Sequence, residues 1–121
     1  MATATGHTQA IQASRVIGTD VYNTEGEHIG TIEDVMLDKS SNNIMYAVVG
    51  FGGFLGIGEK YHTVPWASLD YEPHRGGYVV PFTRSQLEAA PVYDINDLTK
   101  DDGTQARDAS YDYYKVPRYW L

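Results

Sequence analysis

A glycine-rich stretch near the middle of the chain limits the possible folds more than any other feature. Five glycines fall within nine residues, from Gly50 to Gly58, and are interleaved with Phe54, Leu55 and Ile57. Glycine permits positive φ angles and close backbone approach, so this stretch connects two elements rather than continuing one. Such a stretch is either a phosphate-binding loop or a structural connection with an apolar tip.

The residues around the glycines oppose phosphate binding. A P-loop places Lys and then Ser or Thr after its last glycine, because these side chains reach the phosphates and Mg²⁺. Gly53 and Gly58 have the P-loop spacing, but Glu59 stands at the lysine position and would repel phosphate. The dinucleotide fingerprint fails too, because Leu55 replaces its third glycine. The sequence favours the structural connection, and a small-molecule or anion site at loop 50–58 is the alternative.

The segments flanking the loop predict strands. Residues 44–51 are apolar on both faces, as in a central strand, and residues 60–64 form the next strand, which Pro65 ends because it has no N–H. Four further strands are expected on similar grounds at residues 16–22, 28–38, 67–71 and 77–80.

Two local signals refine this pattern. The apolar residues of the 28–38 segment change parity, which indicates a bulge or bend near 30–34. Thr83 is a good N-cap for a short helix over 84–90, which Pro91 stops. The sequence therefore predicts an all-β fold: a small curled antiparallel β-barrel of about six strands, with a short C-terminal helix and an aromatic tail.

Length and local composition divide the chain into three parts. Its 121 residues fit one domain. We expect a disordered N-terminal arm at 1–13, a barrel domain at 14–92 and a C-terminal extension at 93–121. Solvated tails are usually poor in aromatic residues, so the extension is expected to pack on the barrel or on a second subunit. Its clustered aromatic residues are Tyr111, Tyr113, Tyr114, Tyr119 and Trp120.

Composition excludes several functions. Sixteen acidic against nine basic residues give a net charge of −7, which argues against nucleic acid and anionic membranes as partners. No apolar run approaches 18 residues, so no membrane insertion is expected. The absence of cysteine excludes disulfides and thiol catalysis. The first residues do not resemble a secretory signal, and a cytoplasmic location is expected.

Catalytic and metal-binding patterns are weak. The four histidines lie in separate segments without ligand spacing, so no metal or cofactor is expected. His62 with Asp70 or Glu72 is the one acid–base pairing that the sequence suggests, and solvated surface charge explains these carboxylates better. We therefore predict no catalytic residue and no enzymatic activity.

Residues 14–92 carry an ordered set of motifs. They are Ser14-x-Val16-x-Gly18-x-x-Val21-Tyr22, Gly26-Glu27-x-Ile29-Gly30-x-Ile32-x-Asp34-Val35, Tyr46-Ala47-Val48-Val49, Gly52-Gly53-Phe54-Leu55-Gly56-Ile57-Gly58 and Val64-Pro65-Trp66. In this order they resemble the PRC-barrel family, which includes the cytoplasmic domain of the photosynthetic reaction centre H subunit and the C-terminal domain of a ribosome maturation factor. The resemblance implies a small curled antiparallel barrel that acts as a binding or assembly module, with no catalytic motif.

We therefore expect a non-enzymatic protein-binding module that forms a homodimer or binds another protein. A ribosome- or RNA-associated accessory role is a further alternative, which the acidic balance opposes. Apolar bulk at the expected periphery of the barrel nominates the contact residues, which are Phe54, Leu55, Ile57, Trp66, Tyr113, Tyr114, Tyr119 and Trp120.

Overall fold

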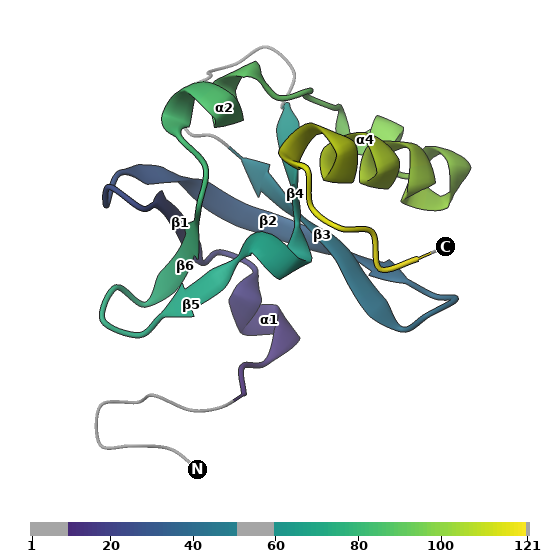
Figure 1. The fold of residues 1–121 in the computed structure, drawn as a ribbon. Coiled ribbons are helices and arrows are strands. Elements are labelled where there is room, and N and C mark those ends of the chain that lie inside the picture. The colour runs from purple at the N-terminus through teal and green to yellow at the C-terminus, as the bar shows by residue number, and fades with distance from the viewer. Residues whose placement is uncertain (1–9, 51–59, 121) are drawn as a thin grey trace.

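The computed structural model describes residues 10–50 and 60–120, which form one six-stranded mixed sheet with helices beside it (Figure 1). The strand order is β4-β3-β2-β1-β6-β5. The strands are β1 (Asp20–Asn23), β2 (His28–Asp38), β3 (Asn43–Gly50), β4 (Tyr61–Pro65), β5 (Asp70–Glu72) and β6 (Gly77–Val80). The predicted β fold of six strands is confirmed. The structure refines it, because β1 and β6 pair in parallel and the described strands leave β4 and β5 as two edges of a sheet that does not close.

Bulges curl the two longest strands. Between β2 and β3, Ile32 pairs with Val49 and Asp34 with Val48, so Glu33 is an extra residue on β2. This confirms the bulge that the change of parity predicts. A second irregularity lies further along the same pair and leaves Met45 as the extra residue on β3. Bulges bend a strand and increase its twist, which gives this sheet its curl.

The chain enters the sheet differently from the prediction. The sequence predicts one strand over 16–22, but helix α1 (Ala13–Val16) comes first and β1 begins only at Asp20. Gly18 lies between them with a φ of 93°, in the left-handed region that turns the chain. The strand prediction is therefore wrong for the residues before Asp20.

Apart from α1, which precedes β1, one 3₁₀ turn lies between β4 and β5 and the other helices follow the last strand. The predicted helix is confirmed as α2 (Arg84–Ala89), and Thr83 caps it: the Gln86 N–H donates to Thr83 Oγ1 at 3.1 Å, and the Thr83 N–H donates to Gln86 Oε1 at 2.9 Å. The helices that the sequence did not predict are the 3₁₀ turns η1 (Trp66–Ser68) and η2 (Lys100–Gly103), and the α-helices α3 (Ile95–Leu98) and α4 (Thr104–Tyr114). Within residues 10–50 and 60–120, no helix combines the length and apolarity needed to cross a membrane.

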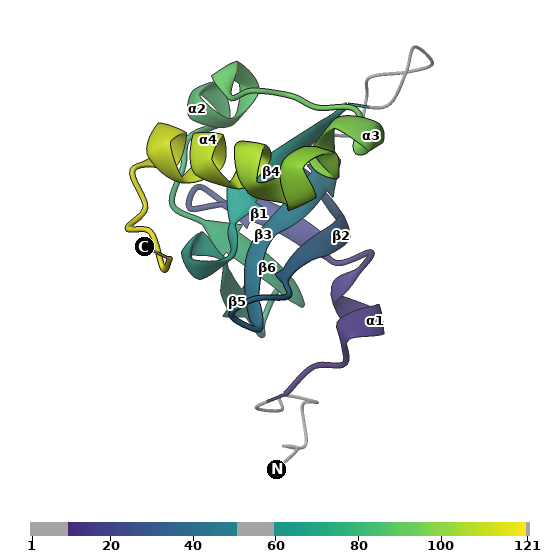
Figure 2. The same ribbon diagram turned by 90° about the vertical axis from the view of Figure 1, so that its right-hand side faces the viewer.

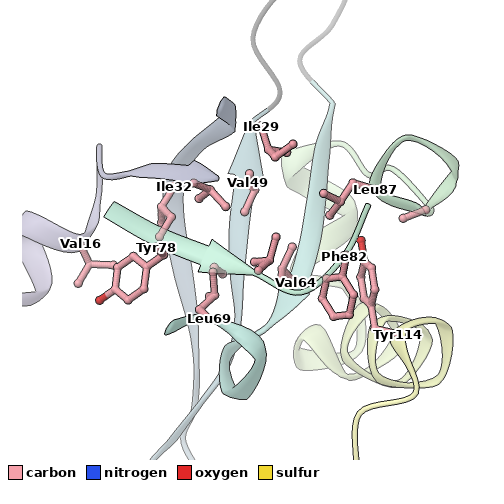
Figure 3. Packing of buried hydrophobic residues seen from close by; sticks show 14 residues of the cluster. Val16, Ile29, Ile32, Val49, Val64, Leu69, Tyr78, Phe82, Leu87 and Tyr114 are labelled. Atoms are coloured by element: carbon pink, nitrogen blue, oxygen red, sulfur yellow. The ribbon is translucent and has the colours of Figure 1, made fainter. Parts of the chain in front are cut away.

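Strand β3 separates two hydrophobic clusters, because alternate residues of a strand point to opposite faces. Ala47 and Val49 belong to the first cluster, which Figure 3 shows together with side chains of α2 and the end of α4. Tyr46 and Val48 belong to the second cluster, which also contains Met45, Leu98 and Ala106. Both faces of β3 are therefore buried, which confirms the central strand predicted for 44–51.

Gly77 tests the close packing of the parallel β1–β6 pair. A Cβ atom at Gly77 would lie 2.5 Å from the carbonyl oxygen of Asp20, which is backbone and cannot move aside. We expect Gly77→Ala to lower the free energy of unfolding in urea by about 2 kcal/mol. The control is Gly50→Ala, whose Cβ would lie nearest to the flexible Glu33 side chain and which should change that free energy by less than about 1 kcal/mol. Equal effects of the two substitutions would contradict this account.

Candidate interaction surface

The C-terminal extension, residues 93–120, covers the outer edge of β4. The backbones of Tyr61 and Tyr93 form two hydrogen bonds of 2.9 Å, one in each direction. Two residues along the strand, the Ser110 hydroxyl donates to the carbonyl oxygen of Thr63 at 2.9 Å. Pro65 lies two residues further along β4 and has no N–H group. An uncovered edge strand is a template for pairing with another chain, and the extension removes that template here.

Helix α4 packs across β3 and β4 (Figure 2). It buries Ala106, Ser110, Tyr111 and Tyr114 on one side. The Tyr111 hydroxyl donates to the carbonyl oxygen of Met45 at 2.7 Å, and burial raises the pKa of Tyr111 to about 12. Met45 is the extra residue of the bulge, so Tyr111 supplies a partner for a carbonyl at an irregular position of the strand ladder.

A buried ion pair joins the end of β2 to α4. Arg107 Nη1 lies 3.6 Å from Asp38 Oδ2, and the two side chains are only 11% and 8% exposed. The Tyr119 hydroxyl donates to the same Asp38 oxygen at 2.7 Å, and this bond, followed by the Ser40 backbone N–H, lowers the pKa of Asp38. The Arg107 guanidinium lies 3.8 Å from the centre of the Trp120 ring. The last residues of the extension therefore cover the ion pair.

The five predicted contact residues that the structure describes lie mostly within the chain's own packing. Tyr114 is 8% exposed and stacks on Phe82 with ring centres 4.2 Å apart. Tyr119 and Trp120 are half-buried over the ion pair, and Trp66 is half-buried against the first cluster. Tyr113 is exposed, although its hydroxyl donates to the Gln86 carbonyl oxygen at 2.7 Å. Hence only Tyr113 among these five presents an exposed side chain.

The other three predicted contact residues, Phe54, Leu55 and Ile57, lie outside the described residues. Their role at an apolar loop tip stays a prediction. The structure describes only the two anchor points of this segment, at Gly50 in β3 and at Tyr61 in β4.

Two exposed apolar side chains, which we call the Val92–Ile95 patch, lie beside these anchor points. Val92 is 48% exposed and Ile95 is 49% exposed. They flank Tyr93, whose backbone bonds to the first residue of β4. Neither residue is among the contact residues that the sequence predicts. The spacing of apolar residues at 92, 93, 95 and 98 is the signal that could have found it.

Charged side chains of both signs border the patch. Lys60 Nζ lies 2.7 Å from Asp94 Oδ1, and Lys100 Nζ lies 2.9 Å from Asp97 Oδ1. Hydrogen bonding to Asp94 raises the pKa of Lys60, so its charge is present throughout the neutral range. An apolar centre with a polar rim is the arrangement typical of protein–protein contacts.

The residues considered for chemistry occupy separate environments. His62 is buried in β4, and burial lowers its pKa to about 4, so it is neutral at pH 7. Asp70 is exposed and Glu72 is half-exposed, both in the opposite edge strand β5. Over the part of the chain that the structure describes, no three His, Asp or Glu side chains are grouped to hold a metal ion.

Comparison with known protein families gives a match. The family model of the PRC-barrel domain matches residues 9–87, more than half of the chain. The match ends within α2, so α3 and α4 lie beyond it. No curated protein matches the chain.

Two tyrosines on α4 test its docking. Tyr111→Phe leaves the buried carbonyl of Met45 without its hydroxyl donor and should lower the free energy of unfolding by about 1–2 kcal/mol. Tyr113→Phe removes a hydroxyl bond at an exposed position and should cost less than about 0.5 kcal/mol. Urea denaturation measures both free energies. A larger loss of unfolding free energy for Tyr113→Phe than for Tyr111→Phe would contradict the docking of α4 described above.

His62 makes stability depend on pH. Its pKa falls from 6.5 in the unfolded chain to about 4 in the fold, so between these values the unfolded chain binds more protons. The free energy of unfolding should therefore fall as pH decreases from 6.5 to 4, by up to about 3 kcal/mol. His62→Gln should flatten this slope relative to wild type in urea denaturation at several pH values. Parallel pH profiles would refute a buried neutral His62.

Proposed function

Because this chain belongs to the PRC-barrel family, whose domain is a small β-barrel module generally used for interaction, we propose that it is a non-enzymatic binding and assembly protein. Its partner in this proposal is another protein, and first of all a second copy of the same chain. The proposal keeps the cytoplasmic location expected from the sequence.

The Val92–Ile95 patch is the observation that carries the proposal. Burying a side chain of this size contributes about 1.5–3 kcal/mol, so two of them would add appreciably to an interface. The patch lies next to the anchor points of the glycine-rich segment, where the sequence places further apolar residues.

The rim of the patch supports a second copy as the partner. It carries two lysines and two aspartates in the pairs Lys60–Asp94 and Asp97–Lys100. Like charges opposed across an interface are costly, and a rim of mixed sign can be arranged to avoid them. The net charge of −7 would disfavour association only through weaker, screened repulsion at longer range.

The positions of the buried ionisable groups support a structural role for these groups. Asp38 and Arg107 are paired beneath the last residues of the extension, and His62 is kept neutral by burial. None of these three groups faces solvent to any large extent. They favour a binding role over catalysis, which requires ionisable groups within reach of a substrate.

Substitution of the patch tests the proposal. We expect the double variant Val92→Ser with Ile95→Ser to weaken self-association at least tenfold, because tenfold corresponds to about 1.4 kcal/mol and two buried aliphatic side chains contribute more. Analytical ultracentrifugation over a concentration series measures the dissociation constant. The control is Leu37→Ser, since Leu37 is 62% exposed at the far end of β2. A wild-type protein that stays monomeric, or equal weakening by the control, would contradict the proposal.

A further inference from the structure

Three consecutive residues with left-handed backbone separate α3 from α4. The φ angles are 51° at Asp101, 56° at Asp102 and 80° at Gly103. A single L-residue in this conformation is strained, and two in succession before a glycine are rare. Thr99 and Thr104, on either side, have right-handed helical dihedrals. These three residues, which we call the hinge, therefore interrupt what would otherwise be one helix.

The hinge also leaves the start of α4 without a side-chain cap, although the Thr104 N–H donates to the carbonyl oxygen of Asp101. Gly103 occupies the N-cap position and has no side chain to accept a hydrogen bond from the first turn. The first N–H groups of a helix need such acceptors or water. If the hinge became right-handed, residues 95–114 would form one helix about 30 Å long, and carbonyls from the preceding turn would accept from these N–H groups. Opening the hinge would thus relieve strain and replace the Thr104–Asp101 bond with the regular backbone bonds of a continuous helix.

Opening would also uncover the surface on which α4 docks. The carbonyl oxygens of Thr63 and Met45 would lose the hydroxyl groups that donate to them, and the Asp38 carboxylate would lose Arg107. A partner for this surface must carry one cationic group and two hydroxyl donors, spaced as they are on α4, on a helix with an apolar face. The partner that carries this set is α4 of a second copy, through charge complementarity between Asp38 and Arg107.

We propose that two copies of this chain exchange α4 through the hinge, so that each α4 docks on β3 and β4 of the other copy. This inference rests on the proposed function, because it takes the second copy as partner and names the segment exchanged. The exchange reproduces the contacts of α4 with the sheet, changes those with α3 and η2, and closes a twofold symmetric dimer. The strain released at Asp101 and Asp102 offsets part of the cost of association.

Charge-reversal substitutions at the Asp38–Arg107 pair test the exchange directly. Asp38→Arg alone sets two arginines against each other within one chain, and Arg107→Asp alone sets two aspartates against each other. In an exchanged dimer of the two variants, both positions again pair an acid with a base. We expect an equimolar mixture, refolded together from urea, to form a heterodimer by native mass spectrometry with a higher melting temperature than either variant. Variants that fold but behave in the mixture as they do alone would overturn the proposal.

Hinge variants keep the proposal testable if the charge variants do not fold. In the docked form, a Cβ atom at Gly103 would lie 3.2 Å from the Leu98 carbonyl oxygen at a positive φ, so Gly103→Ala disfavours this form and should raise the dimer fraction severalfold at fixed concentration. Asp101→Gly with Asp102→Gly relieves the strain in the docked form and should lower the dimer fraction. The control is Gly76→Ala, which has a φ of 68° and an open environment in a distant turn.

The outcomes separate this inference from the proposed function. If the dimer fraction of folded Gly103→Ala equals that of wild type, or if Gly76→Ala raises it equally, exchange of α4 is wrong. If such a result accompanies a wild-type dimer that weakens with Val92→Ser and Ile95→Ser, the proposed function stands without the exchange. If the charge variants form a heterodimer whose stability does not depend on the patch, the exchange stands and the patch is wrong.

Discussion

The structure depends on hydrogen bonds from side-chain hydroxyls of α4 to backbone carbonyls of the sheet. Ser110 and Tyr111 donate to β4 and to the bulge of β3, at positions that strand pairing leaves without a partner. Buried carbonyls without a donor are costly, so these two bonds fix where α4 lies. The backbone bridge between Tyr61 and Tyr93 extends this cover along the same edge. An open six-stranded sheet thereby becomes a module with one protected edge.

Covering the edge also builds the second hydrophobic cluster and places the apolar patch. With α4 on β3 and β4, Tyr46 is fully buried and the Asp38–Arg107 pair is almost so. The connection from α2 to α3 must then run past the start of β4, which exposes Val92 and Ile95 there. Packing of the extension and presentation of a contact surface thus have one cause. This arrangement requires the left-handed hinge at Asp101–Gly103, which lets α4 turn back onto the sheet.

Much of the fold could be predicted from the sequence, because apolar runs and turn residues report strands locally. The apolar run of β3 and the Thr83 cap are such signals. The parallel β1–β6 pair joins segments distant in sequence, and no local pattern encodes it. Helix α4 escaped prediction because its buried side carries Ser110 and tyrosines, although Ala106, Ser110 and Tyr114 recur at helical spacing. The sequence also predicts contact residues among the tail aromatics, and this stays a prediction; in the structure Tyr114, Tyr119 and Trp120 pack against the chain itself.

The central claim is that the extension beyond the family match is part of the folded unit. Removing residues 104–121 and measuring the free energy of unfolding in urea tests it most directly. Loss of α4 takes the donors from two carbonyls, leaves Asp38 without its cation and exposes Tyr46. The account predicts a free energy lower by more than about 3 kcal/mol, or no cooperative transition. A cooperative transition with the wild-type midpoint and slope would contradict it.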